Sequence, residues 1–345
     1  MSVQKKKGML MLTDGNSDNA SARIRALQYI PFFEAQGYNV THIPRVPKRP
    51  SSLIRKYTVF PVLKRWYSLK MFLAIVLGKW DIVFIQRIFV RKRLLELLNS
   101  RSIPIIYDFD DAIYINPKRP ENRDKTANMV RYANKVIVST EYLNEFCNYY
   151  GQEPIIIPSP VETDRIRPCE KQKDQILTIG WIGSPWTSGF LELIEKPLQR
   201  LAEKYTFRFI TVGARSDYKI LGINHIAKPW VFEDENENIG LMDIGLMPLP
   251  DNDWTRMKGG YKLLQYMSAG IPCIASPVGI NQSIVKVGQN GFLASSKDEW
   301  YLILEKLICD RELRIRLGLN GRRDAVELYS REVCFGKLLK SIKTI

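Results

Sequence analysis

Short apolar runs alternate with amphipathic segments along the first half of the chain. The runs GMLMLT, YNVTHI, DIVFIQ, PIIYDF and KVIVS begin at residues 8, 38, 81, 104 and 135. Runs of this kind are typical of parallel strands that are buried on both faces of a sheet. Residues 20–36 carry Ile24, Leu27, Ile30 and Phe33 at helical spacing, and Pro31 is expected to kink or interrupt that helix. The alternation predicts a doubly wound α/β domain over residues 1–160.

A second, similar pattern follows a break. Residues 154–175 mix prolines with charges, which is the composition of a linker. The runs ILTIGWIG, TFRFITVG, MDIGLMPL and IPCIAS then begin at residues 176, 206, 242 and 271. They predict a second Rossmann-like domain over residues 161–330, with a cleft between the two domains. The closing helical residues, 331–345, are expected to cross back to the first domain.

Two lysines stand at the start of a helix that is predicted over residues 261–269 and closed by Gly270. Lys258, Lys262 and Gln265 share one face of this helix, and the opposite, apolar face carries Leu263, Leu264 and Met267. Lysines four residues apart repel each other and oppose the helix dipole, at a cost of about a few tenths to 1 kcal/mol. A bound phosphate reverses both effects.

The neighbours of these lysines also favour an anion. Gly259 and Gly260 allow backbone N–H groups to approach a phosphate closely. Apolar runs before and after the helix place its start at the carboxyl edge of a sheet, where open α/β sheets bind ligands. The alternative is a solvated lysine face on a surface helix.

Positive charge is concentrated in one segment. The chain has a net charge of +15, and residues 35–80 contain no Asp or Glu. Large apolar residues are interleaved with the cations there, but the apolar stretch 71–77 is far shorter than the roughly 20 residues that span a bilayer. We expect peripheral contact with an anionic membrane; the alternative is a solvated basic face over an ordinary core helix. The cations are Arg45, Lys48, Arg49, Arg55, Lys56, Lys64, Arg65, Lys70 and Lys79.

Other function classes are disfavoured. Five scattered cysteines without a CxxC pair, and a lysine-rich start without a secretory signal, favour the cytoplasm. His42 and His225 have no neighbours at metal-ligand spacing, so we expect no metal. No groove-reading or base-stacking motif accompanies the basic segment, so we expect no nucleic-acid partner.

Three blocks of sequence resemble a known family. WIGSPWT at residue 181, MPLPDNDWTRMKGGYKLLQYMSAGIPCIASPVG at residue 247 and NGFLA at residue 290 are similar to the nucleotide-sugar domain of family 4 glycosyltransferases with the GT-B fold. The likeness extends to the first domain through ASARIRALQYIPFF and YDFDDAIY. The resemblance implies a retaining, metal-independent hexosyltransferase that needs no cofactor. Its nucleoside diphosphate sugar would bind the second domain, and a lipid-linked or cell-envelope glycan acceptor the first.

The chain departs from this family at two positions. The family usually carries two glutamates separated by seven residues, and Met257 and Gln265 stand there instead. Gln265 can still hydrogen-bond ribose hydroxyls, whereas Met257 cannot bind a sugar hydroxyl. These departures support an alternative, a catalytically silent partner or regulatory subunit that keeps the fold.

The lysines also take over a role that the family often assigns elsewhere. Its basic pair for the diphosphate often lies where this chain has Gly183 and Ser184, so we assign that work to Lys258 and Lys262, assisted by Arg256. These cations would stabilise the charge that develops on the departing phosphate. Gly183 and Ser184 could offer a backbone cradle or form a plain turn. The expected donor-binding residues are Gly183, Ser184, Val231, Arg256, Lys258, Gly259, Gly260, Lys262, Leu263 and Gln265.

The acceptor site is expected after strands of the first domain. The DFDD run at residues 108–111 suggests a metal site, but its position favours Asp110 or Asp111 as the group that orients or deprotonates an acceptor hydroxyl. The alternative makes Asp108 a helix cap, with the other carboxylates solvated. Asp110 completes the catalytic set with Lys258 and Lys262. The expected acceptor-binding residues are Asp14, Gly15, Ser21, Arg23 and Asp111.

Arg23 has a specific expected role. It could hold an anionic acceptor group such as a lipid pyrophosphate. The alternative makes Arg23 and Arg25 surface charges at a helix start.

Overall fold

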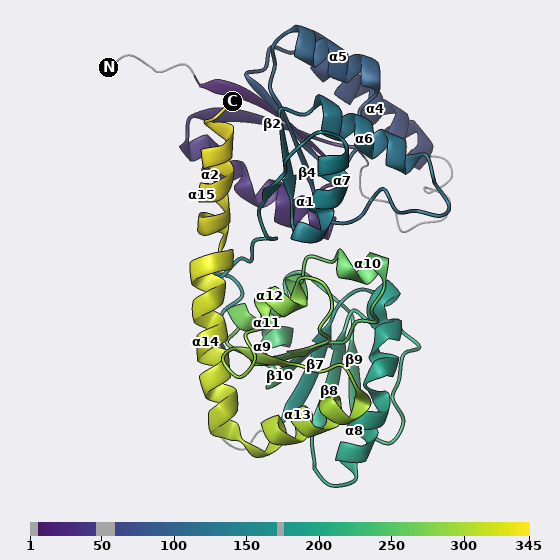
Figure 1. Cartoon of the computed structure of the whole chain (residues 1–345), viewed down its shortest axis with the longest axis vertical. Coiled ribbons are helices and arrows are strands. Elements are labelled where there is room, and N and C mark those ends of the chain that lie inside the picture. The colour runs from purple at the N-terminus through teal and green to yellow at the C-terminus, as the bar shows by residue number, and fades with distance from the viewer. Residues whose placement is uncertain (1–5, 46–58, 171–175) are drawn as a thin grey trace. The chain divides into compact units, whose positions relative to one another are not determined.

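The predicted alternation of strands and helices is present, and it forms two α/β units. The computed structural model describes residues 6–45, 59–170 and 176–345 (Figure 1). One unit contains Met1–Pro160 together with Cys334–Ile345, and the other contains Val161–Val333.

The first unit is built on a six-stranded parallel sheet with the order β2-β1-β3-β4-β5-β6. The five predicted apolar runs form β1 to β5, and a short β6 extends the sheet. Strand order reverses between β1 and β3, so ligands are expected beside the carboxyl ends of these two strands. The strands are β1 (Lys7–Thr13), β2 (Tyr38–Pro44), β3 (Ile82–Gln86), β4 (Ile105–Phe109), β5 (Lys135–Val138) and β6 (Ile155–Ile156).

Helices cover this sheet. The interruption that Pro31 predicts is present, because residues 20–36 form three short helices and Pro31 stands in the first turn of the last one. A proline there removes no helical hydrogen bond. The helices of the unit are α1 (Ala20–Arg25), η1 (Leu27–Tyr29), α2 (Ile30–Ala35), α4 (Val59–Leu77), α5 (Lys92–Ser100), α6 (Asn122–Tyr132), η2 (Glu141–Leu143) and α7 (Asn144–Tyr149).

The last helix of the chain, α15 (Arg331–Ile342), packs from Cys334 onward in the first unit beside α2 (Figure 1). The ring of Phe335 lies 5.0 Å from that of Phe33, 5.2 Å from that of Phe32 and 5.6 Å from that of Tyr29. An aromatic cluster therefore joins the end of the chain to its beginning.

The second unit repeats the architecture with the strand order β12-β11-β10-β7-β8-β9, again parallel throughout. Its order reverses between β7 and β10. The four predicted runs form β7, β8, β10 and β11, whereas β9 and β12 carry no comparable apolar run. The strands are β7 (Thr178–Ile182), β8 (Arg208–Val212), β9 (Asn224–Lys228), β10 (Ile244–Met247), β11 (Cys273–Ala275) and β12 (Gly291–Leu293).

Helices flank the second sheet as well. They are η3 (Pro185–Leu193), α8 (Glu195–Ala202), α9 (Glu235–Gly240), α10 (Asp253–Arg256), α11 (Tyr261–Ser268), α12 (Asn281–Ile284), α13 (Lys297–Cys309) and α14 (Arg311–Tyr329). Helix α11 ends as predicted, with Gly270 in the left-handed region at φ 69°. Among the described residues, no helix combines the length and apolar character that crossing a bilayer requires.

The expected linker over residues 154–175 is largely packed structure, which corrects that interpretation. It contains β6, and the side chains of Val161 and Ile166 are fully buried in the second unit. The Val161 N–H also donates to the Tyr329 carbonyl at 2.9 Å. Proline and charge dominate the composition there, but the isoleucines and valine between them supply apolar contacts. Residues 171–175 lie outside the described part of the chain.

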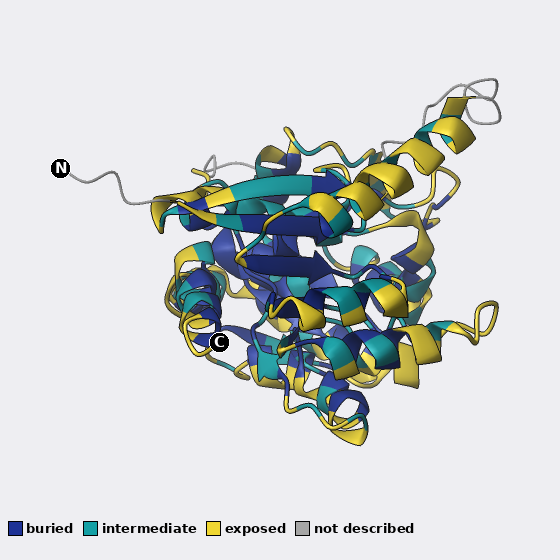
Figure 2. Cartoon of the chain, turned by 90° about the horizontal axis from the view of Figure 1, so that it is seen from above, coloured by how far each residue is buried: buried dark blue, intermediate teal, exposed yellow. Residues whose placement is uncertain are grey.

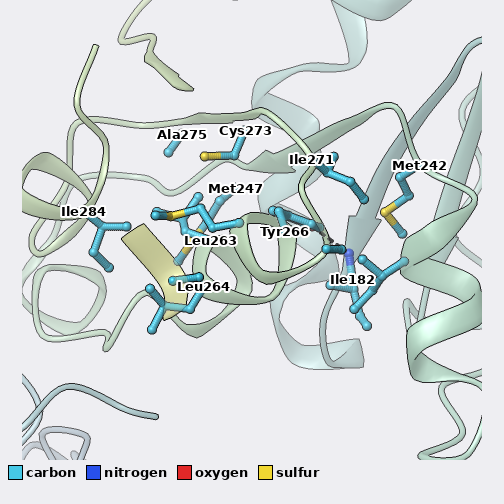
Figure 3. Close-up of a cluster of buried hydrophobic side chains, with 14 of the residues drawn as sticks. Ile182, Met242, Met247, Leu263, Leu264, Tyr266, Ile271, Cys273, Ala275 and Ile284 are labelled. Carbon is cyan, nitrogen blue, oxygen red and sulfur yellow. Dashed lines mark hydrogen bonds between the residues drawn. The ribbon is translucent and has the colours of Figure 1, made fainter. Parts of the chain in front are cut away.

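A buried cluster fixes α11 on the second sheet. Leu263, Leu264 and Tyr266 belong to this cluster, which Figure 3 shows around the strand residues Met247 and Ile182. The Tyr266 hydroxyl accepts the Ile182 N–H at 3.1 Å and donates to the Leu246 carbonyl at 3.1 Å. Because those residues belong to β7 and β10, the helix is tied to both strands of the switch point.

Candidate functional site

The start of α11 combines a glycine cap with close packing. Gly260 has φ 67°, and a side-chain Cβ there would come within 2.4 Å of Ile284 Cδ1. The positive φ angle and the nearby Ile284 side chain both require glycine at position 260. Gly260 has no side chain that could cap α11, so an external anion at this end meets the positive end of the helix dipole.

Lys262 lies against the end of β7. A Cβ on Gly183, the residue after β7, would come within 2.8 Å of Lys262 Cε. Lys262 Nζ lies 5.5 Å from the ring centroid of Trp181. The structure therefore brings Lys262 and Gly183 together at one of the two strands that flank the switch point.

Lys258 is positioned by an aromatic side chain that the sequence patterns did not single out. Its Nζ lies 3.7 Å from the ring centroid of Trp254 on α10, which is a cation–π contact. The Trp254 ring in turn lies 5.9 Å from that of Phe190 on η3, the helix that follows β7. Trp254 is half-exposed, so an aromatic surface borders this cation.

Arg256 differs from its expected role as an assisting free cation. Arg256 Nε lies 2.6 Å from Asp251 Oδ1, and Arg256 Nη2 lies 3.1 Å from Asp251 Oδ2. Asp253 adds a second carboxylate, at 3.7 Å. The hydrogen bond from Arg256 lowers the pKa of Asp251 below its usual value. The positive charge of Arg256 is thus largely matched within its own loop.

The backbone cradle expected at Gly183 and Ser184 needs correction. The Gly183 N–H already donates to the Val212 carbonyl at 2.9 Å, so it is not available to a phosphate. Ser184 caps η3 in a reciprocal capping box with Thr187. The turn therefore serves the local structure, and the contribution of Gly183 is the space that it leaves for Lys262.

Leu263 and Gln265 differ in their surroundings on α11. Leu263 is fully buried in the core and its N–H bonds the Gly260 carbonyl at 2.9 Å, so it presents no group to a ligand. Leu263, which was expected among the donor-binding residues, lies instead on the apolar face of α11. Gln265 is only 3% exposed, and no hydrogen bond to its side-chain amide is present among the described residues. An amide that makes no side-chain hydrogen bond within the protein can donate to and accept from a ligand hydroxyl.

Val231 lies on the loop that follows β9. This strand pairs with β8, so Val231 stands beyond the same carboxyl edge as Gly183. Its side chain is 39% exposed. The neighbouring Trp230 donates its indole N–H to Glu235 at 2.9 Å, which fixes the loop.

Three residues predicted for the acceptor side, Asp14, Ser21 and Asp110, meet in the first unit near the carboxyl ends of β1, β3 and β4. The Ser21 hydroxyl lies 2.8 Å from each carboxylate oxygen of Asp110. Gln86 donates to the same hydroxyl at 2.7 Å and accepts the Asp14 N–H at 3.3 Å. Gln86, which connects them, was not predicted.

Arg87 is the second residue of this group that sequence reasoning missed. Its guanidinium lies 3.3 Å from Asp110 and 3.1 Å from Asp111. Burial disfavours its charge, but the neighbouring carboxylates of Asp110, Asp111 and Asp14 raise the pKa of Arg87 above its ordinary value. Arg87 also has φ 58°, which is unusual for a side chain other than glycine. Its place directly after a predicted strand, DIVFIQ, was the available signal.

Gly15 and Arg23 both form hydrogen bonds within the turn that follows β1. The Gly15 carbonyl accepts a hydrogen bond from Thr13 Oγ1 at 2.7 Å, within the turn after β1. Arg23 donates to the Ser17 carbonyl at 2.7 Å. The expected role of Arg23, to hold an anionic acceptor group, stays a prediction. The cations that contact these carboxylates include Arg87, on Asp110 and Asp111, and Arg45, on Asp14.

Asp108 and Arg25 form a buried ion pair. Two bonds, of 2.6 Å and 3.1 Å, join the guanidinium to the carboxylate, and both side chains are about fully buried. Burial raises the pKa of Asp108 to about 6, against the opposing effect of Arg25. Neither the alternative of Asp108 as a helix cap nor that of Arg25 as a surface charge holds. In the described part of the chain, no group of three or more His, Cys, Asp or Glu side chains forms a metal-binding cluster.

The region that contains both lysines also matches known sequences. Residues 173–310 match the family described as Glycosyl transferases group 1. This group 1 match spans β7 to α13 and includes Gly183, Lys258, Lys262 and Gln265. No curated protein sequence matches the chain.

Solved structures resemble the whole chain in fold. A glycosyltransferase from Rickettsia africae has 13% identity and a TM-score of 0.71, with 99% of each chain covered. Sucrose-phosphate synthase from Thermosynechococcus elongatus has 13% identity and a TM-score of 0.69, over 98% of this chain and 100% of that one. HepE of Anabaena, solved in complex with UDP, has 13% identity and a TM-score of 0.66, over 98% and 100%. The two doubly wound units are those of the GT-B fold.

Proposed function

We propose that the chain is a retaining glycosyltransferase that moves a hexose-type sugar from a nucleoside diphosphate sugar to a lipid-linked or cell-envelope glycan, without a metal ion. The observation that carries this proposal is the position of Lys262. Its stem lies against Gly183 at the end of β7, beside the glycine-capped start of α11 and inside the group 1 match. An anionic ligand at this point meets a cation and the positive end of the α11 dipole together.

The chemistry follows from where charge develops. When the bond between sugar and diphosphate breaks, negative charge grows on the leaving phosphate. Fixed cations and dipoles aimed at that charge stabilise the transition state more than the ground state. Lys262 and Lys258 would supply the cations, and Trp254 would hold Lys258 in place through the 3.7 Å ring contact.

The buried amide of Gln265 supports a contact to the ribose. It lies on the lysine-bearing helix, is 3% exposed and has no side-chain partner among the described residues. Two ribose hydroxyls can both donate to and accept from an amide. The UDP in the HepE structure is a nucleotide of the class that we propose as part of the donor.

The acceptor side would use the carboxylates of the first unit. Asp110 is held by Ser21 and Arg87, which leaves its oxygens able to accept a further hydrogen bond from a sugar hydroxyl. With an acceptor attached to a lipid carrier, the sugar transfer takes place at the cytoplasmic face of a membrane. We include that location in the proposal.

The test is stabilisation by donors. Among UDP, GDP and dTDP sugars, one nucleotide class is expected to raise the melting temperature by mass action. Lys262→Ala should abolish the shift and, like Lys258→Ala, lower turnover by about 10²-fold or more. Lys306→Ala is the control, because Lys306 also lies over a ring, Phe292, at 5.4 Å but on α13. A full shift in folded Lys262→Ala protein would contradict the site. Activity should persist in EDTA.

A catalytically silent partner is the second candidate, favoured by Met257 and Gln265 at positions where the resembled family has glutamates. It predicts stabilisation by a nucleotide sugar with neither transfer nor donor hydrolysis. Release of nucleoside diphosphate from the stabilising donor, lost in Lys262→Ala, would exclude this candidate.

A further inference from the structure

Helix α4 exposes a stripe of large apolar side chains. Val62, Trp66, Leu69, Leu73 and Leu77 recur at intervals of three and four residues, so they lie on one face of the helix. Their exposed fractions run from 41% for Leu73 to 73% for Leu77. Much of this helix has the yellow colour of exposed residues in Figure 2. We call these five residues the α4 stripe.

The α4 stripe is not the face that holds the helix to its unit. The one fully buried residue described in α4 is Ile75, and the helix packs on α5 and β2. Phe60, Tyr67 and Met71 lie on the side of Ile75 and are half-buried. The stripe lies on the opposite side. Contiguous apolar surface of this kind on a soluble unit marks an interaction site.

Positive charge borders the α4 stripe. Arg65 and Lys70 flank it on the helical wheel, and Lys64 adds a third exposed cation to a helix without any acidic residue. None of the ion pairs found among the described residues involves these three cations. Lys48, Arg49, Arg55 and Lys56, also named in the basic segment, lie outside the described residues, so the inference does not use them.

More cations gather where the stripe ends. Leu77 also borders a hollow of about 810 Å³ at the amino end of the first sheet. Its lining includes the basic residues Lys6, Lys7, Lys79 and Arg101. The one carboxylate in the lining, Asp81, accepts the Gly8 N–H at 2.6 Å. An apolar side chain and four cations thus meet at one end of α4.

We propose that α4 docks on the surface of an anionic lipid bilayer. The helix lies in the plane of the interface, with the α4 stripe buried at the boundary between headgroups and acyl chains. Arg65, Lys70 and the cations near Leu77 contact lipid phosphates. Trp66 stands in the middle of the stripe, and tryptophan favours this interface. The inference deepens the proposed function by assigning its membrane contact to a surface.

The positive charges beside the α4 stripe favour a bilayer over a second copy of the chain as the partner of α4. Two α4 stripes packed together would bring Arg65 and Lys70 of both copies close, with no acidic residue on either helix to offset them. Anionic headgroups match the same cations. Nucleic acid would satisfy the charges but would leave the five apolar side chains in water.

The test is flotation of the full chain with vesicles. Wild-type protein should float with phosphatidylcholine–phosphatidylglycerol vesicles and far less with phosphatidylcholine alone. Trp66→Ser with Leu69→Ser should weaken binding by at least about tenfold. Arg65→Gln with Lys70→Gln should weaken it by about 30-fold, the contribution of two basic residues near an anionic surface. Leu302→Ser with Leu319→Ser is the control, since these leucines are 61% and 66% exposed on α13 and α14.

Three results would overturn the inference. They are unchanged flotation of the stripe variant, equal flotation with neutral vesicles, and a lipid-free dimer that the stripe substitutions dissociate. The rise in melting temperature on donor binding tests the proposed function independently of membrane binding. Stripe variants should retain it, whereas Lys262→Ala should lose it and still float.

Discussion

At the scale of single residues, Gly183 shows how a motif position can have a different role from the expected one. Its N–H is used within the sheet, but its missing side chain leaves room for two neighbours. A Cβ there would come within 2.4 Å of the Trp181 ring and 2.8 Å of Lys262 Cε. Gly183 therefore positions a cation by leaving space for it.

Gly183→Ala is expected to displace Lys262 and to lower turnover by about 10²-fold, because a shift of about 1 Å in a catalytic group has an effect of that order. Steady-state kinetics at a temperature where the variant stays folded measure it. Gly189→Ala on η3 is the matched control, because a Cβ there meets nothing within 4 Å. Equal loss in both variants would mean that the effect is not due to Lys262.

The sequence predicted which residues stand at strand ends and helix starts, but not which of them touch. Asp14, Ser21 and Asp110 could be assigned to one edge because each follows an apolar run. Gln86 and Arg87 stand at a strand end as well, yet their contacts depend on β3 pairing with both β1 and β4. Strand order is set by packing of the whole sheet, which local periodicity does not report.

At the scale of elements, α11 is held between the sheet and α14. Tyr266 bonds both switch-point strands, and α14 approaches the opposite end of the helix through a glycine. A Cβ on Gly318 would lie 2.0 Å from the Gly270 carbonyl oxygen. The helix that carries the lysines therefore depends on a close contact with a later helix.

Gly318→Ala should destabilise the second unit by about 1–3 kcal/mol, because the clash with backbone outweighs the gain in helix propensity. Gly336→Ala on α15 meets nothing within 4 Å and should instead stabilise by about 0.5–1 kcal/mol. Urea unfolding of both variants gives the two signs. A stabilised Gly318→Ala protein would refute the close contact.

Strands and helices could be predicted where their buried side chains give a regular apolar pattern in the sequence. The strands β1, β3, β4 and β5 are mostly buried apolar runs, and each was predicted; the edge strand β2 is only partly buried but still carries an apolar run. Strand β9 was missed because it lies at the edge of its sheet, where Asn224, Ile226 and Ala227 are exposed and no apolar run forms. The carboxyl end of α11 was predicted because Gly270 and Pro272, which cannot continue the helix, follow it in the sequence.

At the scale of the whole molecule, the first unit is completed by the end of the chain. Cys334, Phe335, Leu338 and Ile342 are buried in the same cluster as Met9. The expected crossing of residues 331–345 rested on helix length alone. The aromatic partners of Phe335 could not be read from the pattern, because they are about 300 residues away in sequence.

Phe335→Ala should lower the free energy of unfolding of the first unit by about 3–5 kcal/mol, the usual effect of removing a buried phenyl ring. Hydrogen exchange followed by mass spectrometry should show faster exchange in β1 and α2 but not in β7 or β10. Lys337→Ala, exposed on the same helix, should change stability by less than about 0.5 kcal/mol. Faster exchange in both units would contradict a role confined to the first.

Because the end of the chain returns to the first unit, the second unit is inserted within the sequence of the first. Residues 161–333 form one continuous segment with both junctions in the first unit, whereas that first unit is assembled from two separate segments. Exchange of the second unit between relatives therefore needs two splices, at 160/161 and 333/334. A chimera joined only at the first splice would replace α15 as well and would expose Phe33 to a foreign helix.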